Sequence, residues 1–198
     1  MYFIQLLLLV LTTSTSLAPP SKYVGRTGHL HVESHSRYLD VIADNYQVYS
    51  EINPTSGDVI IRGLTKSFEF KLGALDQAFN SDRFDMRAFD KFRYEGDIKD
   101  LSSVDWDQAG SYPIEVEGFL YMGDYKRKTS ASGTILVLAD GSARAETSFV
   151  MRIEEESMNT INRLMREKLP SMVALDADDL GISRDIQLEL KTNMRPRR

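Results

Sequence analysis

The chain of 198 residues contains no cysteine, and this absence excludes several kinds of protein. A disulfide scaffold, a thiol nucleophile, a lipid-anchored cysteine and a cysteine-rich metal site all require a residue that the chain lacks. The domain must therefore be stabilised by its hydrophobic core alone, which a chain of this length can build. The sequence also lacks internal repeats and low-complexity segments.

Positive charge is scarce as well. The 24 Lys and Arg residues are outnumbered by 29 Asp and Glu residues, giving a formal net charge of −5. Nucleic-acid binding requires a concentrated positive surface, so we expect no nucleic-acid partner. No run of like charge is longer than that at 154–156, which is too short for an interaction tail. We interpret the basic residues 193–198 as a solvated tail.

Long apolar runs are also missing, because the one at the N-terminus is too short for a membrane-spanning helix of about 20 residues. Residues 1–18 place an apolar stretch, Leu6 to Leu11, before a hydroxyl-rich segment and small residues. This order is typical of a secretory signal peptide. We expect cleavage after Ala18, or after Ser16 because Pro19 hinders the first site, and export to the periplasm or the medium. The exported domain is predicted to span residues 22–192.

The clearest structural signal is the alternation of apolar and polar residues between Tyr112 and Ile153. It predicts three successive strands with one buried face and one wet face. Asp140-Gly141 lies between the last two strands, and Asp-Gly favours a tight hairpin because glycine accepts a positive φ. Such neighbours pair antiparallel, and their apolar faces must be covered.

Alternation recurs along the rest of the chain, which predicts an all-β fold. Further strands are expected at 28–34, 38–43, 45–52, 59–61, 67–72, 90–99 and 186–190. Two helical interruptions are predicted, a short one at 74–80 and an amphipathic one at 157–169 that Pro170 ends. Many short strands joined by tight turns are typical of a sandwich or an up-and-down barrel.

Few residues are candidates for metal binding or catalysis. His29 and His31 share one face of a predicted strand, and with Glu33 they could bind zinc or copper. The other interpretation is a polar, solvent-facing strand edge, which we favour. Glu115 and Glu117 alternate on a wet face, where nothing would separate their pKa values as an acid/base pair requires. We therefore predict no enzyme, no cofactor and no resident metal.

Several motifs, read in order, resemble the YceI-like family of exported bacterial proteins. They are Lys66-Ser67-Phe68-Glu69-Phe70, Phe79-Asn80, Arg93-Tyr94-Glu95-Gly96, Tyr112-Pro113-Ile114-Glu115-Val116-Glu117-Gly118-Phe119-Leu120, Gly133-Thr134-Ile135, Asp140-Gly141 and Ser183-Arg184-Asp185-Ile186-Gln187-Leu188. The resemblance covers residues 25–192 and is that of a divergent member. It implies a lipocalin-like antiparallel barrel of about eight strands, with short helical insertions, that holds an isoprenoid or another lipid in its apolar interior.

The composition of the inward faces agrees with that expectation. An eight-stranded barrel has room for packed side chains or one small ligand, and small inward residues such as Gly96, Gly118, Ala143, Ala145 and Thr147 would leave space. Aromatic residues and methionine provide a lining for a flexible apolar guest. The predicted lining residues are Phe68, Phe70, Phe92, Tyr94, Val116, Leu120, Phe149 and Met151.

The leading hypothesis is therefore an exported protein that holds or carries a long apolar ligand and contacts membranes only transiently. Two alternatives remain open: a non-catalytic interaction or membrane-rim module that uses the helix 157–169, and a metal-dependent enzyme at His29 and His31. Replacing Ala145 by Trp is expected to block ligand loading without unfolding the protein. The ligand and the oligomeric state are not predicted.

Overall fold

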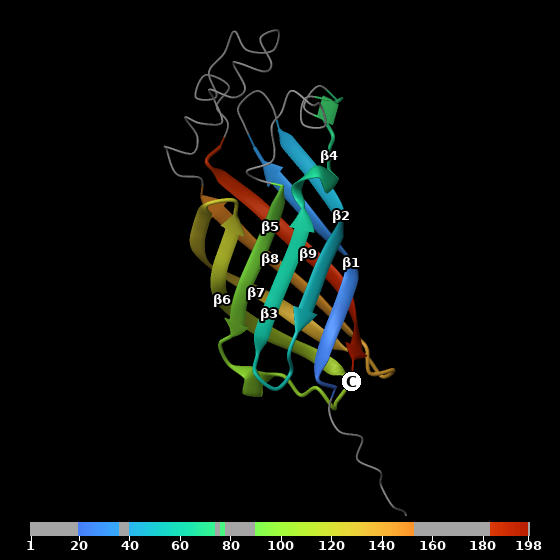
Figure 1. Ribbon diagram of the computed structural model, residues 1–198. Coiled ribbons are helices and arrows are strands. Elements are labelled where there is room, and N and C mark those ends of the chain that lie inside the picture. The colour runs from blue at the N-terminus through green and yellow to red at the C-terminus, as the bar shows by residue number, and fades with distance from the viewer. Residues whose placement is uncertain (1–19, 36–39, 74–75, 78–89, 153–182, 198) are drawn as a thin grey trace, which may run out of the picture.

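A computed structural model describes residues 20–35, 40–73, 76–77, 90–152 and 183–197 of the chain. Within these ranges the backbone forms nine strands of a single sheet (Figure 1). The strands are β1 (Lys22–Ser34), β2 (Val41–Ile52), β3 (Asp58–Leu64), β4 (Phe68–Phe70), β5 (Lys91–Ile98), β6 (Gly110–Met122), β7 (Tyr125–Val137), β8 (Ala143–Arg152) and β9 (Asp185–Arg197).

The sheet closes on itself. Its strand order is β1-β9-β8-β7-β6-β5-β3-β2-β4, and β1 also pairs with β2. Every pairing is antiparallel. Closure removes the exposed sheet edges that would otherwise invite aggregation. The predicted all-β antiparallel barrel is confirmed, whereas the predicted helix 157–169 and most of the segment 74–80 lie outside the described residues.

The short strand β4 is a continuation of β3 rather than a ninth strand of the barrel wall. A 3-10 turn, η1 (Thr65–Ser67), separates the two strands, and both pair with β2. β3 pairs with the half of β2 that contains Ile52, and β4 with the half that contains Ala43. The barrel wall therefore consists of eight strands when β3 and β4 are counted as one strand that η1 interrupts.

The structure corrects the predicted strands between residues 38 and 52. They form one strand, β2, because its first half pairs with β1 and β4 and does not end at Asp44. The alternation shifts within the strand: Asn45 is fully buried, and the next two residues, Tyr46 and Gln47, are both exposed, Tyr46 at 53%. The Asn45 side chain donates to the Leu64 carbonyl and accepts from the Gln47 N–H, so its burial leaves no polar group unpaired.

The prediction of a solvated basic tail at 193–198 is wrong for residues 193–197. These residues are the last part of β9, where Arg197 lies opposite Lys22 and Arg195 opposite Val24 of β1. Met194 is only 1% exposed and anchors this part of the strand in the core. The basic side chains are therefore spaced along a strand and do not form a free cluster.

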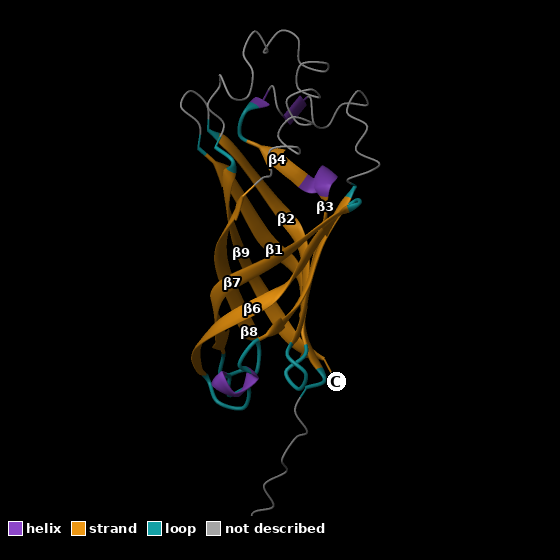
Figure 2. Cartoon of the chain, turned by 90° about the vertical axis from the view of Figure 1, so that its left-hand side faces the viewer, coloured by secondary structure: helices purple, strands orange, loops and turns teal. Residues whose placement is uncertain are grey.

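The two ends of the barrel differ, and we name them by their turns. The lower end carries the 3-10 turn η3 (Leu101–Ser103) and the turn between β7 and β8; the upper end carries the turn between β6 and β7 and the start of β5 (Figure 2). At the lower end the Trp106 ring stacks on Tyr23, with 4.8 Å between ring centroids. The loop that follows η3 therefore contributes a large side chain to the core.

Candidate ligand-binding site

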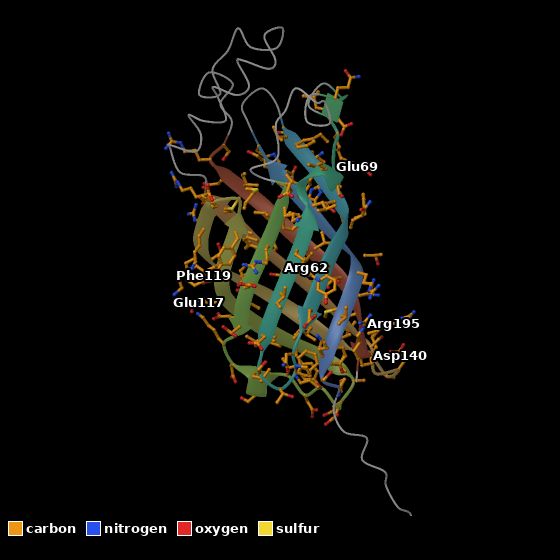
Figure 3. All side chains as sticks on the ribbon, viewed as in Figure 1. Arg62, Glu69, Glu117, Phe119, Asp140 and Arg195 are labelled. Carbon is orange, nitrogen blue, oxygen red and sulfur yellow. The ribbon has the colours of Figure 1, made fainter. Side chains whose placement is uncertain are left out.

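The inner face of the barrel is made by the period of two along each strand. On β6, Ile114 and Val116 are buried, while Glu117 and Phe119 lie on the other face and point away from the barrel (Figure 3). The inward side chains gather in two clusters, one in each half of the barrel. We call them the lower cluster and the upper cluster.

The lower cluster is a closely packed core. All its principal members are at most 8% exposed: Tyr23, Ile52, Val59, Tyr94, Ile98, Val104, Ile114, Val116, Ile135, Val137, Ala143 and Met194. Leu101 and Trp106 pack against it from the segment around η3. Side chains packed to this degree leave little room for a guest, so this half of the barrel is a conventional hydrophobic core.

The upper cluster is looser. Five of its members are buried, namely Leu30, Val48, Phe92, Leu188 and Leu190, and six apolar neighbours are only partly buried: Val32, Ile61, Phe68, Phe149, Met151 and Ile186. Its inward apolar side chains are thus less completely buried, on average, than those of the lower cluster. This half is the candidate ligand site.

The predicted lining residues divide between the two clusters. Phe68, Phe92, Phe149 and Met151 are in the upper cluster; Tyr94, Val116 and Leu120 belong to or pack on the lower cluster; Phe70 is in neither. Sequence reasoning omitted Val32, Ile61 and Ile186 from the site, although each occupies an apolar position of an alternating strand. The sequence does not give the position of each residue along the barrel axis, because that position depends on the register between strands.

The sequence suggested that the small inward residues would leave space in the barrel, but not all of them do. A Cβ added to Gly118 would lie 2.2 Å from the Glu95 carbonyl oxygen, and one added to Gly96 would lie 2.6 Å from the Glu117 carbonyl oxygen. These glycines let the backbones of β5 and β6 approach each other closely. Ala143, at 1% exposure, is a packed member of the lower cluster.

Tyr94 is a buried ionisable side chain of the lower cluster. Burial, with a smaller contribution from the Asp97 and Glu117 carboxylates, raises the pKa of Tyr94 to about 12. Its hydroxyl donates to the Thr129 carbonyl at 3.4 Å. The phenol therefore stays protonated at neutral pH and acts as a neutral, hydrogen-bonded part of the wall rather than as a base.

One charged side chain occupies an inward position in the upper half. Arg127 lies directly opposite Leu120, which packs in the barrel interior, and residues opposite each other in a sheet share a face. Its guanidinium donates to the Tyr125 hydroxyl at 3.5 Å. No carboxylate in the described part of the chain forms an ion pair with it. A positive group thus lies on the inward face of β7, near the end of the barrel at which β6 turns into β7.

The outer wall of β1 and β2 carries the histidines that the sequence had singled out. His29 and His31 lie on the outside, opposite the inward Leu30 and Val32, as the alternation indicates. The structure adds Asp44 of β2, whose Oδ1 is 2.7 Å from a ring nitrogen of each histidine. Sequence reasoning missed Asp44 because only the pairing of β1 with β2 brings it there.

A groove of about 680 Å³ lies near the lower end, beside the part of β1 that is not paired with β9. Charged and polar residues form much of its lining, including Arg26, Asp140, Asn193 and Arg195 (Figure 3 labels Asp140 and Arg195). Hydrogen bonds from Ser142, with a smaller effect of Arg195, lower the pKa of Asp140. A groove of this polarity does not suit a long apolar ligand.

No protein-family model and no curated protein matches the sequence. Solved structures do resemble the barrel. One is a polyisoprenoid binding domain from Saccharophagus degradans implicated in plant cell wall breakdown, with a TM-score of 0.64 and 10% identity over 89% of this chain and 99% of that chain. Burkholderia cenocepacia BcnA follows, with a TM-score of 0.55 and 10% identity over 84% of this chain and 95% of that one.

The chain has the barrel fold of these two structures. The resemblance stated from the motifs is thus supported at the level of the fold, at about 10% sequence identity. A Campylobacter jejuni YceI protein is also similar, with a TM-score of 0.49 and 13% identity over 80% of this chain and 86% of that one. In the described residues, no helix is both long and apolar enough to cross a membrane.

Proposed function

We propose that this chain is a divergent YceI-like protein, exported by its N-terminal segment, that holds a long apolar ligand in the upper half of the barrel. The observation that carries the proposal is the larger share of partly buried apolar side chains in the upper cluster, where six accompany five buried residues, than in the lower cluster, where six accompany twelve. An isoprenoid or a fatty amphiphile has the matching shape and chemistry.

The driving force would be the removal of apolar surface from water. Burial contributes about 25 cal/mol per Å², before the cost of ordering the ligand is subtracted. The six partly buried neighbours of the upper cluster supply such surface. Met151 adds a flexible side chain that can adapt to an irregular guest. A small number of polar groups, such as Arg127, would fix the orientation of the ligand.

The similar structures support a binding role. The Saccharophagus degradans domain is described as polyisoprenoid binding, and its fold extends over 89% of this chain. Since the likeness is one of fold, the ligand class is carried to this chain as a proposal and rests on the chemistry of the upper cluster. We expect no catalysis, because the inward face brings no nucleophile together with a base in the described residues.

Neighbouring residues of β8 provide a matched test. Met151 is half-buried in the upper cluster, whereas Val150 points outward and is 64% exposed. Met151→Trp is expected to fill the apolar space and to lower the affinity for a long-chain isoprenoid alcohol or fatty acid at least tenfold. Val150→Trp should leave binding unchanged. Titration of each variant with the two ligands, read by native mass spectrometry, measures the difference.

The proposal fails if the parent protein binds neither ligand, or if both variants bind like the parent. Thermal unfolding of the two variants shows whether a loss of binding reflects a loss of fold. The substitution suggested by the sequence, Ala145→Trp, is unsuitable for this purpose. Ala145 packs against the lower cluster, so a large side chain there is expected to overpack the core and destabilise the barrel.

A further inference from the structure

All three histidines of the chain lie close together on or next to β1, and they are outside the barrel. His29 and His31 project outward from the strand, and His35 directly follows it. This wall faces away from the apolar interior, so the proposed ligand site gives no reason for the arrangement. The cluster can be considered independently of that site.

The closest part of the cluster joins two strands. Asp44 lies opposite His31 in the register of β1 and β2. Its Oδ1 is 2.7 Å from His29 Nε2 and 2.7 Å from His31 Nδ1. The three atoms that could bind a metal ion, one from each residue, lie within 4.8 Å of one another. Two imidazoles and one carboxylate therefore converge on a common point.

The backbone and a neighbouring ring hold His29 in this position. The pairing of β1 with β2 changes register between Gly28 and Leu30, so that His29 sits in an irregularity of the ladder. Such bulges re-aim a side chain. The ring of His29 also stacks on that of Tyr46, with 4.5 Å between centroids and 11° between planes. This explains why Tyr46 faces outward, against the expected alternation.

A second carboxylate lies on the far side of His31. The free nitrogen, Nε2, is 3.9 Å from Glu33 Oε2, and Glu33 Oε1 is in turn 3.5 Å from His35 Nε2. Histidines that bind metals commonly direct their other ring nitrogen to a carboxylate, which fixes the tautomer and makes the ring a better ligand. Glu33 lies on the side of His31 that such an arrangement requires.

We propose that His29, His31 and Asp44 form a binding site for a divalent transition-metal ion, for which Zn²⁺ is the best match. Imidazole and carboxylate ligands suit Zn²⁺, whereas Mg²⁺ and Ca²⁺ prefer oxygen ligands alone. Two ligand atoms that are each about 2.1 Å from an ion lie about 3.0 Å or more apart. The observed 2.7 Å separations therefore need only small side-chain rotations to admit the ion.

The exposure of the three side chains is suited to a site that forms at the surface. The side chains of His29, His31 and Asp44 are 34%, 24% and 14% exposed. An ion can reach them from solvent, and water can complete its coordination. Because the ligands come from both β1 and β2, bound Zn²⁺ would link two neighbouring strands of the barrel wall.

Calorimetric titration of the tag-free protein with Zn²⁺, in a buffer that does not chelate metals, is the first test. We expect one ion per chain with micromolar or tighter affinity, and a higher melting temperature when the ion is bound. His29→Ala and Asp44→Asn should each weaken binding by about a hundredfold or more. Glu33→Gln should weaken it by about tenfold, as expected for a supporting carboxylate.

His35→Ala is the matched control. His35 is 66% exposed and is not one of the three proposed ligands, so its loss should change the Zn²⁺ affinity less than threefold. The proposal is overturned if the parent protein does not bind Zn²⁺, since the cluster is then only a hydrogen-bonded link between strands. It is equally overturned if His29→Ala and Asp44→Asn bind Zn²⁺ as the parent does.

A measurement on the unmodified protein covers the case in which these variants do not fold. The ring nitrogens of the three histidines can be followed by NMR with ¹⁵N-labelled histidine. Addition of one equivalent of Zn²⁺ should move the signals of two histidines strongly and that of the third only slightly. No change, or an equal change in all three, contradicts the site.

Discussion

The lower and upper halves of the barrel are built from the same strands but are packed differently. In the lower half, inward residues such as Ile135 and Val137 are at most 3% exposed, and the segment after η3 adds Trp106. In the upper half, residues of the same kind, such as Val32 and Ile186, are only partly buried. Alternation along a strand fixes which face is apolar, but it does not determine whether that face is filled.

This difference suggests a division of roles. The lower half supplies the packing from which the free energy of folding comes, since buried apolar area and dense contacts are concentrated there. The upper half contributes less to the free energy of folding and retains apolar surface that a ligand can cover.

The largest effect is expected from truncating the same residue type in each half. Ile135 is fully buried, so Ile135→Ala should lower the free energy of unfolding by about 2–5 kcal/mol. Ile186 is partly buried in the upper cluster, and Ile186→Ala should cost clearly less. Urea unfolding of both variants without ligand measures the difference. Equal losses would contradict the division between the halves.

A second effect concerns the close approach of β5 and β6. Gly118→Ala should destabilise the protein by about 1–3 kcal/mol, because the new methyl group would lie 2.2 Å from the Glu95 carbonyl oxygen and the strands would have to separate. Gly73→Ala is the control, since a Cβ there meets nothing within 4 Å. If the two variants have the same melting temperature, the close packing of this wall is not needed for stability.

A smaller effect is expected from the inward arginine. Arg127→Gln should weaken the binding of a long-chain fatty acid several-fold more than that of the corresponding alcohol, since only the acid carries a negative charge. The neighbouring Lys126 points outward, with its ammonium 4.3 Å from the centre of the Phe119 ring. Lys126→Gln should therefore not discriminate between the two ligands. A loss of discrimination in the Lys126 variant alone would place the head group outside the barrel.

The smallest effect is electrostatic and lies near the lower end. A hydrogen bond from the Tyr49 hydroxyl, helped by the Lys22 ammonium 2.9 Å away, lowers the pKa of Glu51. A lowered carboxyl pKa stabilises the fold above the ordinary value, near 4.5, and this contribution is lost as the pH falls through the folded-state pKa.

Glu51→Gln should therefore destabilise the protein at pH 7 by less than about 1 kcal/mol, because the Lys22 partner is largely solvated. The difference from the parent should shrink as the pH is lowered toward 3. Urea unfolding at both pH values checks this, and a difference that grows on acidification would contradict the assigned cause.

Much of the barrel could be predicted from the sequence because a period of two is a local property. The strands around Val116 and Phe149, the Asp140-Gly141 hairpin and the inward direction of the proposed lining residues that belong to the two clusters all follow from it. Local patterns also have limits. The alternation within β2 shifts near Asn45, and nothing in the sequence marks that irregularity.

What could not be predicted depends on register. The height of Val32 or Ile186 in the barrel, and hence its place in the upper cluster, follows from how β1, β8 and β9 align. The same holds for Asp44, which is 13 residues from His31 in the chain but opposite it in the sheet. The last part of β9 was mistaken for a tail because its charged residues mask Met194, the residue that anchors it.

The most direct test of the central claim asks where a ligand sits. The protein, with its methyl groups labelled for NMR, can be titrated with a spin-labelled long-chain fatty acid, which broadens the signals of nearby methyl groups. We expect strong broadening at Val32 and Ile186 in the upper half and little at Ile135 and Val137 in the lower half. Equal broadening in both halves, or broadening confined to the outward Val150, would contradict it.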